Sequence, residues 1–279
     1  MLSSLCFPDS LKSCFGCCPP IRPEGYDHLD HKNIIRKMLL ENSRNYDPND
    51  RDVRPVTGYS CWAMGFIDSR NRQAGCLLHP CQNNGKDLRY RIDYGNKCLR
   101  EGCQEAGIFE RLNNTEKIFW LNLAEGMDCF EYSSRKNNVL FTMLKWGNTL
   151  LSAIASEDSG RHFNRSGFLD AYPFFITDIS PKGHAYLLTN VVIETGASVL
   201  KNREFKEAFE NFSTGLMPEI KERFYMGDGP VFVHAMNLDS LFADFLRVFL
   251  KIRKSDTSTV EKIRRYTDNR LRLFSEGIK

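Results

Sequence analysis

Apolar residues recur at helical spacing along the second half of this chain and only irregularly along its first hundred residues. Over 238–252, apolar side chains return every three or four positions, a spacing that predicts a helix with one strongly apolar face. The same criterion predicts helices over 115–124, 138–156, 198–212 and 218–225. The hydrophobic pattern therefore predicts a mostly α-helical body from residue 105 onward.

Other stretches predict strands and helix ends. The segments 172–179 and 185–193 are rich in aromatic and β-branched residues, which favour strands, and 231–234 predicts a shorter strand. Ser258 and Glu261 have the spacing of a capping box, so we expect a last helix through 260–274. Near the other end of the chain, we expect Asp30 to cap a helix over 34–39.

Residues 44–58 and 61–103 follow neither pattern. The first segment is polar and contains two prolines, which predicts a connecting loop. The second is rich in glycine and turns, so we expect it to bury little surface and to need a metal in place of a hydrophobic core. We predict an α+β, mainly helical fold, with an irregular cysteine-rich metal-binding module at 1–104. A mostly helical body with a few short strands follows at 105–279, and the pattern leaves open whether the two parts share one core.

Composition changes this prediction little. The chain has 279 residues, of which 42% are hydrophobic, so it can build packed cores and global disorder is not expected. The net charge of +3 does not by itself indicate a nucleic-acid partner. The sequence opens without a basic leader and apolar core, and no stretch reaches the ~20 apolar residues of a membrane span. We therefore expect a cytoplasmic protein without a membrane partner.

The cysteines change the prediction most. Eight of the ten form three local groups plus the separate Cys61, and in a reducing compartment such grouping is more typical of metal binding than of disulfides. Cys14-Phe-Gly-Cys17-Cys18 is a C-x-x-C-C knuckle, whose two-residue gap lets Cys14 and Cys17 approach one metal ion. The adjacent Cys18 is expected to serve the same centre or a second one.

Two pairs with four intervening residues and one separate cysteine follow the knuckle. The predicted metal ligands are Cys14, Cys17, Cys18, Cys61, Cys76, Cys81, Cys98 and Cys103. His79 is a further candidate, either as a ligand or as a hydrogen-bond donor to a bound sulfur. Cys6 and Cys129 are isolated, and we expect them to pack as small hydrophobes. Eight thiolates would form two four-cysteine sites or one polynuclear cluster.

The knuckle, the separated cysteine and Gly75-Cys76-Leu-Leu-His79-Pro80 together resemble the zinc- or iron-chelating cysteine-cluster (YkgJ-like) proteins. The resemblance covers roughly residues 14–103 and implies metal binding without a defined reaction. Those proteins typically carry Cys-x-Ile-Tyr-x-x-Arg-Pro at the second motif. This chain lacks the Tyr and the Arg-Pro, which leaves the identity of the metal open.

Zinc is the favoured cofactor and an iron–sulfur cluster is the alternative, because an uninterrupted ferredoxin-type run of cysteines is absent. Four thiolates close the shell of a zinc ion, which favours a structural role, and we expect the helical body to bind a protein partner. The alternatives are an iron–sulfur redox protein or enzyme and a zinc-stabilised nucleic-acid-binding protein. The latter would use the basic end of the chain, notably Arg264, Arg265, Arg270 and Arg272, although a solvated helix face is the favoured interpretation.

Overall fold

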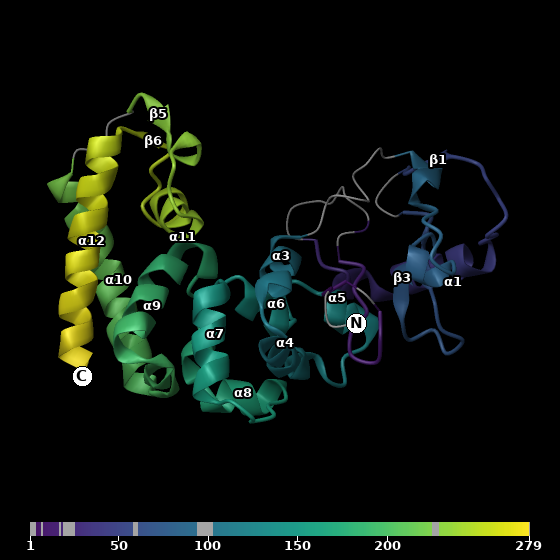
Figure 1. Cartoon of the computed structure of the whole chain (residues 1–279), viewed down its shortest axis with the longest axis horizontal. Coiled ribbons are helices and arrows are strands. Elements are labelled where there is room, and N and C mark those ends of the chain that lie inside the picture. Colours follow the sequence, from purple (N-terminus) through teal and green to yellow (C-terminus); the bar gives the residue numbers. More distant parts are fainter. Residues whose placement is uncertain are drawn as a thin grey trace. The chain divides into compact units, whose positions relative to one another are not determined.

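A computed structural model describes residues 4–6, 8–16, 18, 26–57, 61–93, 103–224 and 229–278. The chain divides into two compact units, Met1–Thr142 and Met143–Lys279, which Figure 1 colours from purple to teal and from teal to yellow. Helices dominate the described residues, and every strand there is two or three residues long. This confirms a mainly helical α+β fold. Within the described residues, no helix has both the length and the apolar character needed to cross a membrane.

The N-terminal unit is built around a short hairpin covered by one helix (Figure 1). The helix α1 (Lys32–Arg44) packs on β2 (Met64–Phe66), which pairs antiparallel with β3 (Ala74–Cys76). Ser43 joins helix and strand, because its Oγ accepts a hydrogen bond from the Phe66 amide at 2.6 Å and donates one to the Phe66 carbonyl at 3.0 Å. A Cβ atom on Gly65 would lie 2.5 Å from that Oγ, so the close approach requires glycine.

The loop predicted over 44–58 contains a two-residue strand, β1 (Arg54–Pro55), which pairs in parallel with β4 (Ile92–Asp93). Arg91, whose side chain is 1% exposed, holds this loop in place. Its Nη2 lies 2.9 Å from an Asp50 carboxylate oxygen, and its Nη1 donates to the Asp47 carbonyl at 3.1 Å. The loop is therefore fixed by charge-assisted hydrogen bonds.

In the described residues, four further helices belong to the N-terminal unit. They are α3 (Gln104–Arg111), α4 (Asn114–Leu121), α5 (Cys129–Ser133) and the start of α6 (Val139–Leu144). The capping boxes Asn113/Glu116 and Asp128/Glu131 begin α4 and α5. Residues 105–142 thus pack with the cysteine-rich segments, whereas the sequence pattern groups them with the helical body.

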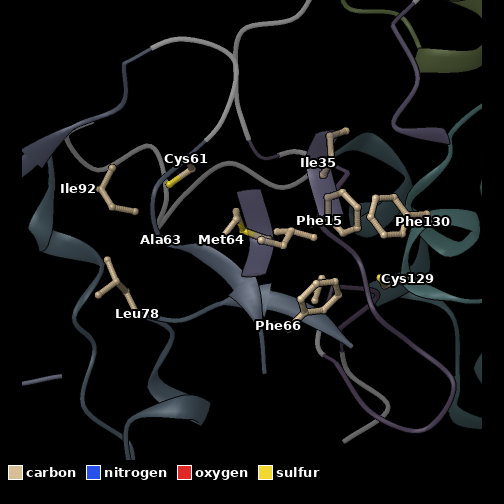
Figure 2. Close-up of a cluster of buried hydrophobic side chains, with 12 residues drawn as sticks. Phe15, Ile35, Cys61, Ala63, Met64, Phe66, Leu78, Ile92, Cys129 and Phe130 are labelled. Atoms are coloured by element: carbon tan, nitrogen blue, oxygen red, sulfur yellow. The ribbon is translucent and has the colours of Figure 1, made fainter. Parts of the chain in front are cut away.

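The N-terminal unit also has a hydrophobic cluster, which the turn-rich sequence of 61–103 does not predict. Phe15 packs edge-on against Phe130 with ring centroids 5.3 Å apart, and Met64 and Phe66 of β2 lie beside them (Figure 2). The cluster is assembled from segments that are far apart in the sequence. Each segment contributes only a few apolar residues. No single stretch of the sequence therefore shows the apolar periodicity of a buried helix or strand.

The C-terminal unit is a bundle around the helix α9 (Pro181–Thr195) (Figure 1). The other helices are α7 (Asn148–Glu157), α8 (Arg165–Ala171), α10 (Arg203–Arg223), α11 (Ser240–Asp244) and α12 (Thr257–Ile278). Helices α7, α11 and α12 all contact α9. The strands β5 (Val231–Phe232) and β6 (Lys254–Ser255), which lie before and after α11 in the sequence, form a small antiparallel sheet.

The strands predicted over 172–179 and 185–193 are wrong. The second stretch lies within α9, which begins with Pro181 in its first turn and buries Leu187, Leu188 and Val191. Burial by helices packed on α9 outweighs the strand preference of its β-branched residues. The first stretch contains the short 3₁₀-helix Pro173–Phe175, whose aromatic side chains pack into the bundle.

Other predicted helices are present in the structure, but they begin and end at different residues than predicted. The helix predicted over 138–156 is split into α6 and α7 by Gly147, whose φ of +92° favours glycine. The predicted helices over 198–212 and 218–225 contribute to one longer helix, α10, which continues through Pro218. A π-helical turn, Phe245–Phe249, follows α11 within 238–252.

Two predicted helix caps are wrong. Helix α12 is capped by Asp256, whose carboxylate accepts a hydrogen bond from the Thr259 amide at 2.9 Å, so Ser258 does not begin it. At the other end of the chain, Asp30 lies in the 3₁₀-helix Leu29–His31, and α1 follows with His31 at its N-cap position. In both cases a neighbouring residue begins the helix.

Candidate metal centre

The predicted ligands fall inside the N-terminal unit. Cys17 and Cys98 lie outside the described residues. Among the residues that are described, no group of three or more His, Cys, Asp or Glu side chains stands ready to hold a metal ion. The surroundings of the other predicted ligands therefore have to be compared individually.

Cys14 is held against the end of α5. The flanking residues bond to Ser133, whose Oγ accepts from the Phe15 amide at 3.0 Å and donates to the Ser13 carbonyl at 3.2 Å. The Cys14 sulfur accepts a hydrogen bond from the Gly16 amide at 3.4 Å. Amide hydrogen bonds to sulfur stabilise a thiolate, which is the form that binds metal.

Cys103 is the N-cap residue of α3, and its sulfur accepts a hydrogen bond from the Ala106 amide at 3.4 Å. The partial positive charge of a helix N-terminus favours an anionic sulfur at this position. Glu105, in the first turn of the helix, lies 4.0 Å from the guanidinium of Arg135. This contact brings the beginning of α3 to the residues that follow α5.

Tyr132 lies among these segments. Its side chain is buried, and burial raises the pKa of its phenol, with further contributions from Cys14, Cys6, Asp9 and Cys103. The Tyr132 hydroxyl donates to the carbonyl of Leu5, the residue before Cys6, at 2.9 Å, and Ser133 bonds to both neighbours of Cys14. We call Cys6, Cys14 and Cys103 the Tyr132 group. Cys6 is the member that the sequence spacing leaves out.

Cys61 is a buried member of the hydrophobic cluster (Figure 2), and the partly buried Cys18 and Cys76 pack against this cluster. We call Cys18, Cys61 and Cys76 the hairpin group. Cys76 pairs with Met64 in the β2–β3 ladder, and the Met64 amide donates to the Cys61 carbonyl at 3.0 Å. The Cys18 amide donates to the carbonyl of Phe15, a member of the cluster, at 3.0 Å. Residues far apart in the sequence thus contact one hydrophobic cluster.

Cys81 differs from both groups. It is exposed, and its amide donates to Nδ1 of His79 at 3.2 Å. Burial lowers the pKa of His79, so its ring is mostly neutral at pH 7. With Nδ1 engaged, ligation by His79 would use Nε2, and that role stays a prediction.

Cys129 is 2% exposed and packs in the hydrophobic cluster. Burial, with a contribution from Asp128, raises the pKa of its thiol to about 12. The thiol therefore stays protonated at physiological pH and is a poor ligand and nucleophile. This environment is the one expected for a cysteine that packs as a small hydrophobe.

The basic residues at the end of the chain are paired with carboxylates. The pairs are Arg264 with Asp239, Arg265 with Glu261, Arg270 with Glu219, and Arg272 with Glu276. An arginine that already faces a carboxylate offers less charge to a phosphate. This pairing favours a solvated helix face over a phosphate-binding surface.

Comparisons with protein-family models, with curated proteins and with solved structures find no match. The resemblance to the cysteine-cluster proteins therefore stays a prediction. Functional inference depends on the residues of the chain itself.

Proposed function

We propose that the N-terminal unit is a metal-binding module in which thiolate-bound zinc fixes loop segments to the α1–hairpin core. The role of the metal is structural, because a shell of four thiolates leaves no open position for a substrate. A metal that joins distant segments of a loop-rich unit contributes its binding free energy to folding.

The observation that supports this proposal is the gathering of cysteines from distant positions into two neighbourhoods. Cys14 and Cys103 are brought to the end of α5, although 89 positions separate them in the sequence. Cys18, Cys61 and Cys76 border one hydrophobic cluster. Thiolates that bind one metal ion have to come from segments that the fold brings together, and these segments pack in one unit although they are far apart in the sequence.

The donor chemistry fits a soft metal ion. Amides donate to the sulfurs of Cys14 and Cys103, and apolar side chains shield the hairpin group from water. Both features stabilise metal–thiolate bonds. Cys17 and Cys98 remain predicted ligands, on sequence spacing alone.

Metal analysis of the purified chain tests this proposal. The protein would be produced with zinc and iron both available, purified under argon, and measured for metal content and absorbance. We expect stoichiometric zinc and no colour, whereas broad absorbance near ~400 nm would indicate an iron–sulfur cluster. A metal-free chain that folds cooperatively and does not take up added zinc would contradict the proposal.

Partner binding by the helical body stays a prediction. Ile193 on α9 and Phe232 on β5 are 63% and 47% exposed, so apolar side chains reach the surface of this unit. Scattered exposed hydrophobes are normal in monomeric proteins and do not by themselves define an interface.

A further inference from the structure

Two adjacent apolar side chains reach the surface of the C-terminal unit on the two-residue strand β5. Val231 and Phe232 are 41% and 47% exposed. Successive residues of a strand point to opposite faces of its sheet, so both faces of the β5–β6 sheet present apolar surface to solvent. Figure 1 places this sheet beside the first turns of α12, at one end of the bundle. The sheet therefore differs from a scattered exposed hydrophobe.

Basic residues border the same sheet. Phe232 pairs with Lys254 of β6, whose ammonium lies 4.6 Å from the centre of the Phe232 ring. Lys251 and Arg253 come shortly before β6 and are exposed. The Arg253 carbonyl accepts a hydrogen bond from the Val233 amide at 3.0 Å, which continues the pairing of the two strands. Backbone pairing thus fixes cationic residues beside the exposed apolar pair.

The charges of these cations are not compensated locally. In the described part of the chain, Lys251, Arg253 and Lys254 form no ion pair with a carboxylate, whereas each arginine of α12 does. The carboxylate that follows them, Asp256, accepts hydrogen bonds from the amide and the hydroxyl of Thr259 at the start of α12. Uncompensated positive charge attracts an anionic partner.

The backbone at Lys251 is a further observation. Its φ is +63°, a left-handed conformation that glycine adopts at lower cost than any residue with a side chain. The chain turns here from the π-helical turn Phe245–Phe249 toward β6. Glycine would suit this turn, whereas lysine places an exposed ammonium beside the apolar pair.

We propose that the β5–β6 sheet binds the surface of a lipid bilayer that contains anionic lipids. Val231 and Phe232 insert among the headgroups, and the three cations face lipid phosphates. Buried apolar area and the attraction of cations to anionic lipids together hold a protein at such an interface, and no membrane-spanning helix is needed. The proposal is independent of the metal-binding module, because residues 143–279 contain no cysteine.

Three features favour a bilayer over another anionic macromolecule. A lipid interface surrounds an inserted sheet on both faces, whereas a folded protein partner covers one face. Strands of two residues offer too few backbone groups for pairing with an added peptide strand. The Lys254 ammonium already lies over the Phe232 ring, which leaves less aromatic surface for a stacked nucleic-acid base.

Co-sedimentation of the full chain with vesicles tests the proposal. We expect binding to vesicles of phosphatidylcholine mixed with phosphatidylglycerol, weaker binding when salt is added, and little binding to phosphatidylcholine alone. The double variant Lys251→Gln/Arg253→Gln should lower the partition coefficient by about 25-fold, because each cation near an anionic surface contributes about fivefold. A chain that does not bind the mixed vesicles would overturn the proposal.

A matched control separates this surface from net charge. The double variant Arg165→Gln/Arg203→Gln removes the same charge from exposed arginines at the starts of α8 and α10. Figure 1 shows α8 away from the β5–β6 sheet, and Phe205 near the start of α10 contacts Phe274 near the end of α12. This control should bind as wild type does, and an equal loss in both double variants would overturn the proposal.

Phe232→Ser separates insertion from simple charge attraction. The side chain is half-exposed, so the fold should persist, and the partition coefficient should fall by about tenfold through lost apolar burial in the bilayer. Unchanged vesicle binding of this variant would overturn the proposal. Binding to a single-stranded oligonucleotide but not to the mixed vesicles would also overturn it and assign the surface to nucleic acid.

Hydrogen exchange of the wild-type protein gives a readout that does not depend on a variant folding. Residues 230–236 and 251–255 should gain protection in the presence of phosphatidylglycerol-containing vesicles and not with phosphatidylcholine alone. Protection confined to other segments would overturn the proposal.

Discussion

The two units of this protein are stabilised by different interactions. In the described part of the N-terminal unit, several charged residues are buried, among them Lys12, Asp27, Arg91 and Glu105. In the described part of the C-terminal unit, Asp158 is the one buried charged residue, and aromatic side chains dominate. Phe174, for example, contacts Phe205 and Phe209 with ring centroids 5.5 Å apart in each case.

This difference shows where a metal would contribute most. Helices of the C-terminal unit satisfy their own backbone and bury apolar faces against one another, so packing alone stabilises them. Loops of the N-terminal unit have to be held by specific bonds, such as those of Ser133 and Arg91. Coordination by thiolates from several loops adds bonds of this specific kind.

The largest expected effect is selective unfolding of the N-terminal unit on metal removal. Apparent binding free energies of structural zinc are about 10–16 kcal/mol, and whole domains are stable by about 5–15 kcal/mol. Chelation, or Cys76→Ser in the hairpin group, should therefore unfold residues 1–142 while 143–279 stay folded. Hydrogen exchange read by mass spectrometry checks this, and equal protection of 1–142 with and without metal would contradict it.

A large cavity in the aromatic core should destabilise the C-terminal unit and leave the N-terminal unit folded. Phe174 is fully buried, so Phe174→Ala is expected to destabilise the C-terminal unit by about 3–5 kcal/mol through lost burial and a cavity. Zinc content should not change. Urea denaturation measures the loss of stability, and metal analysis of the same sample measures the zinc content. A loss of zinc would show that unfolding of the C-terminal unit also destabilises the N-terminal unit.

A smaller effect is expected at Asp158, which accepts a hydrogen bond from the Tyr172 hydroxyl at 2.6 Å and lies 3.0 Å from the Lys201 ammonium. Burial alone would raise the pKa of Asp158, but these two partners lower it below its usual value. Because the folded-state pKa is depressed, the stabilisation is present above the unfolded pKa of about 3.9 and is lost as the pH falls through the folded value.

Asp158→Asn should therefore destabilise the C-terminal unit at pH 7 by about 1–3 kcal/mol. The difference from wild type should shrink as the pH falls below about 4. Urea denaturation across this pH range measures the effect. If the variant's free energy of unfolding stayed below that of wild type by the same amount at every pH, the carboxylate charge would not contribute to stability.

The smallest effect is expected for Cys129→Ala. The side chain is small and lies outside both cysteine groups, so we expect a loss of about 1 kcal/mol and an unchanged zinc content. In wild-type protein, this thiol should resist alkylation until the chain unfolds, because burial raises its pKa to about 12. Loss of zinc in this variant would place Cys129 in the metal-binding set.

Local patterns predicted much of the helical content but not the packing. The spacing over 238–252 correctly indicated buried helical structure, because the apolar residues that recur at helical spacing are the ones buried there. The segment 185–193 was misassigned because its residues suit a buried strand and a buried helix equally well. The elements packed on α9, among them α7, α11, α12 and the π-helical turn Phe245–Phe249, decide between these states.

The sequence by itself determined which residue types are available: grouped cysteines in the first 103 residues and apolar residues at helical spacing after residue 105. Tertiary structure decided which distant segments pack together, and it joined 105–142 to the N-terminal unit. The physical reason is contact range. A cap or a helical face depends on residues within a few positions, whereas the bond from Phe15 to Ser133 spans 118 positions and exists only in the folded chain.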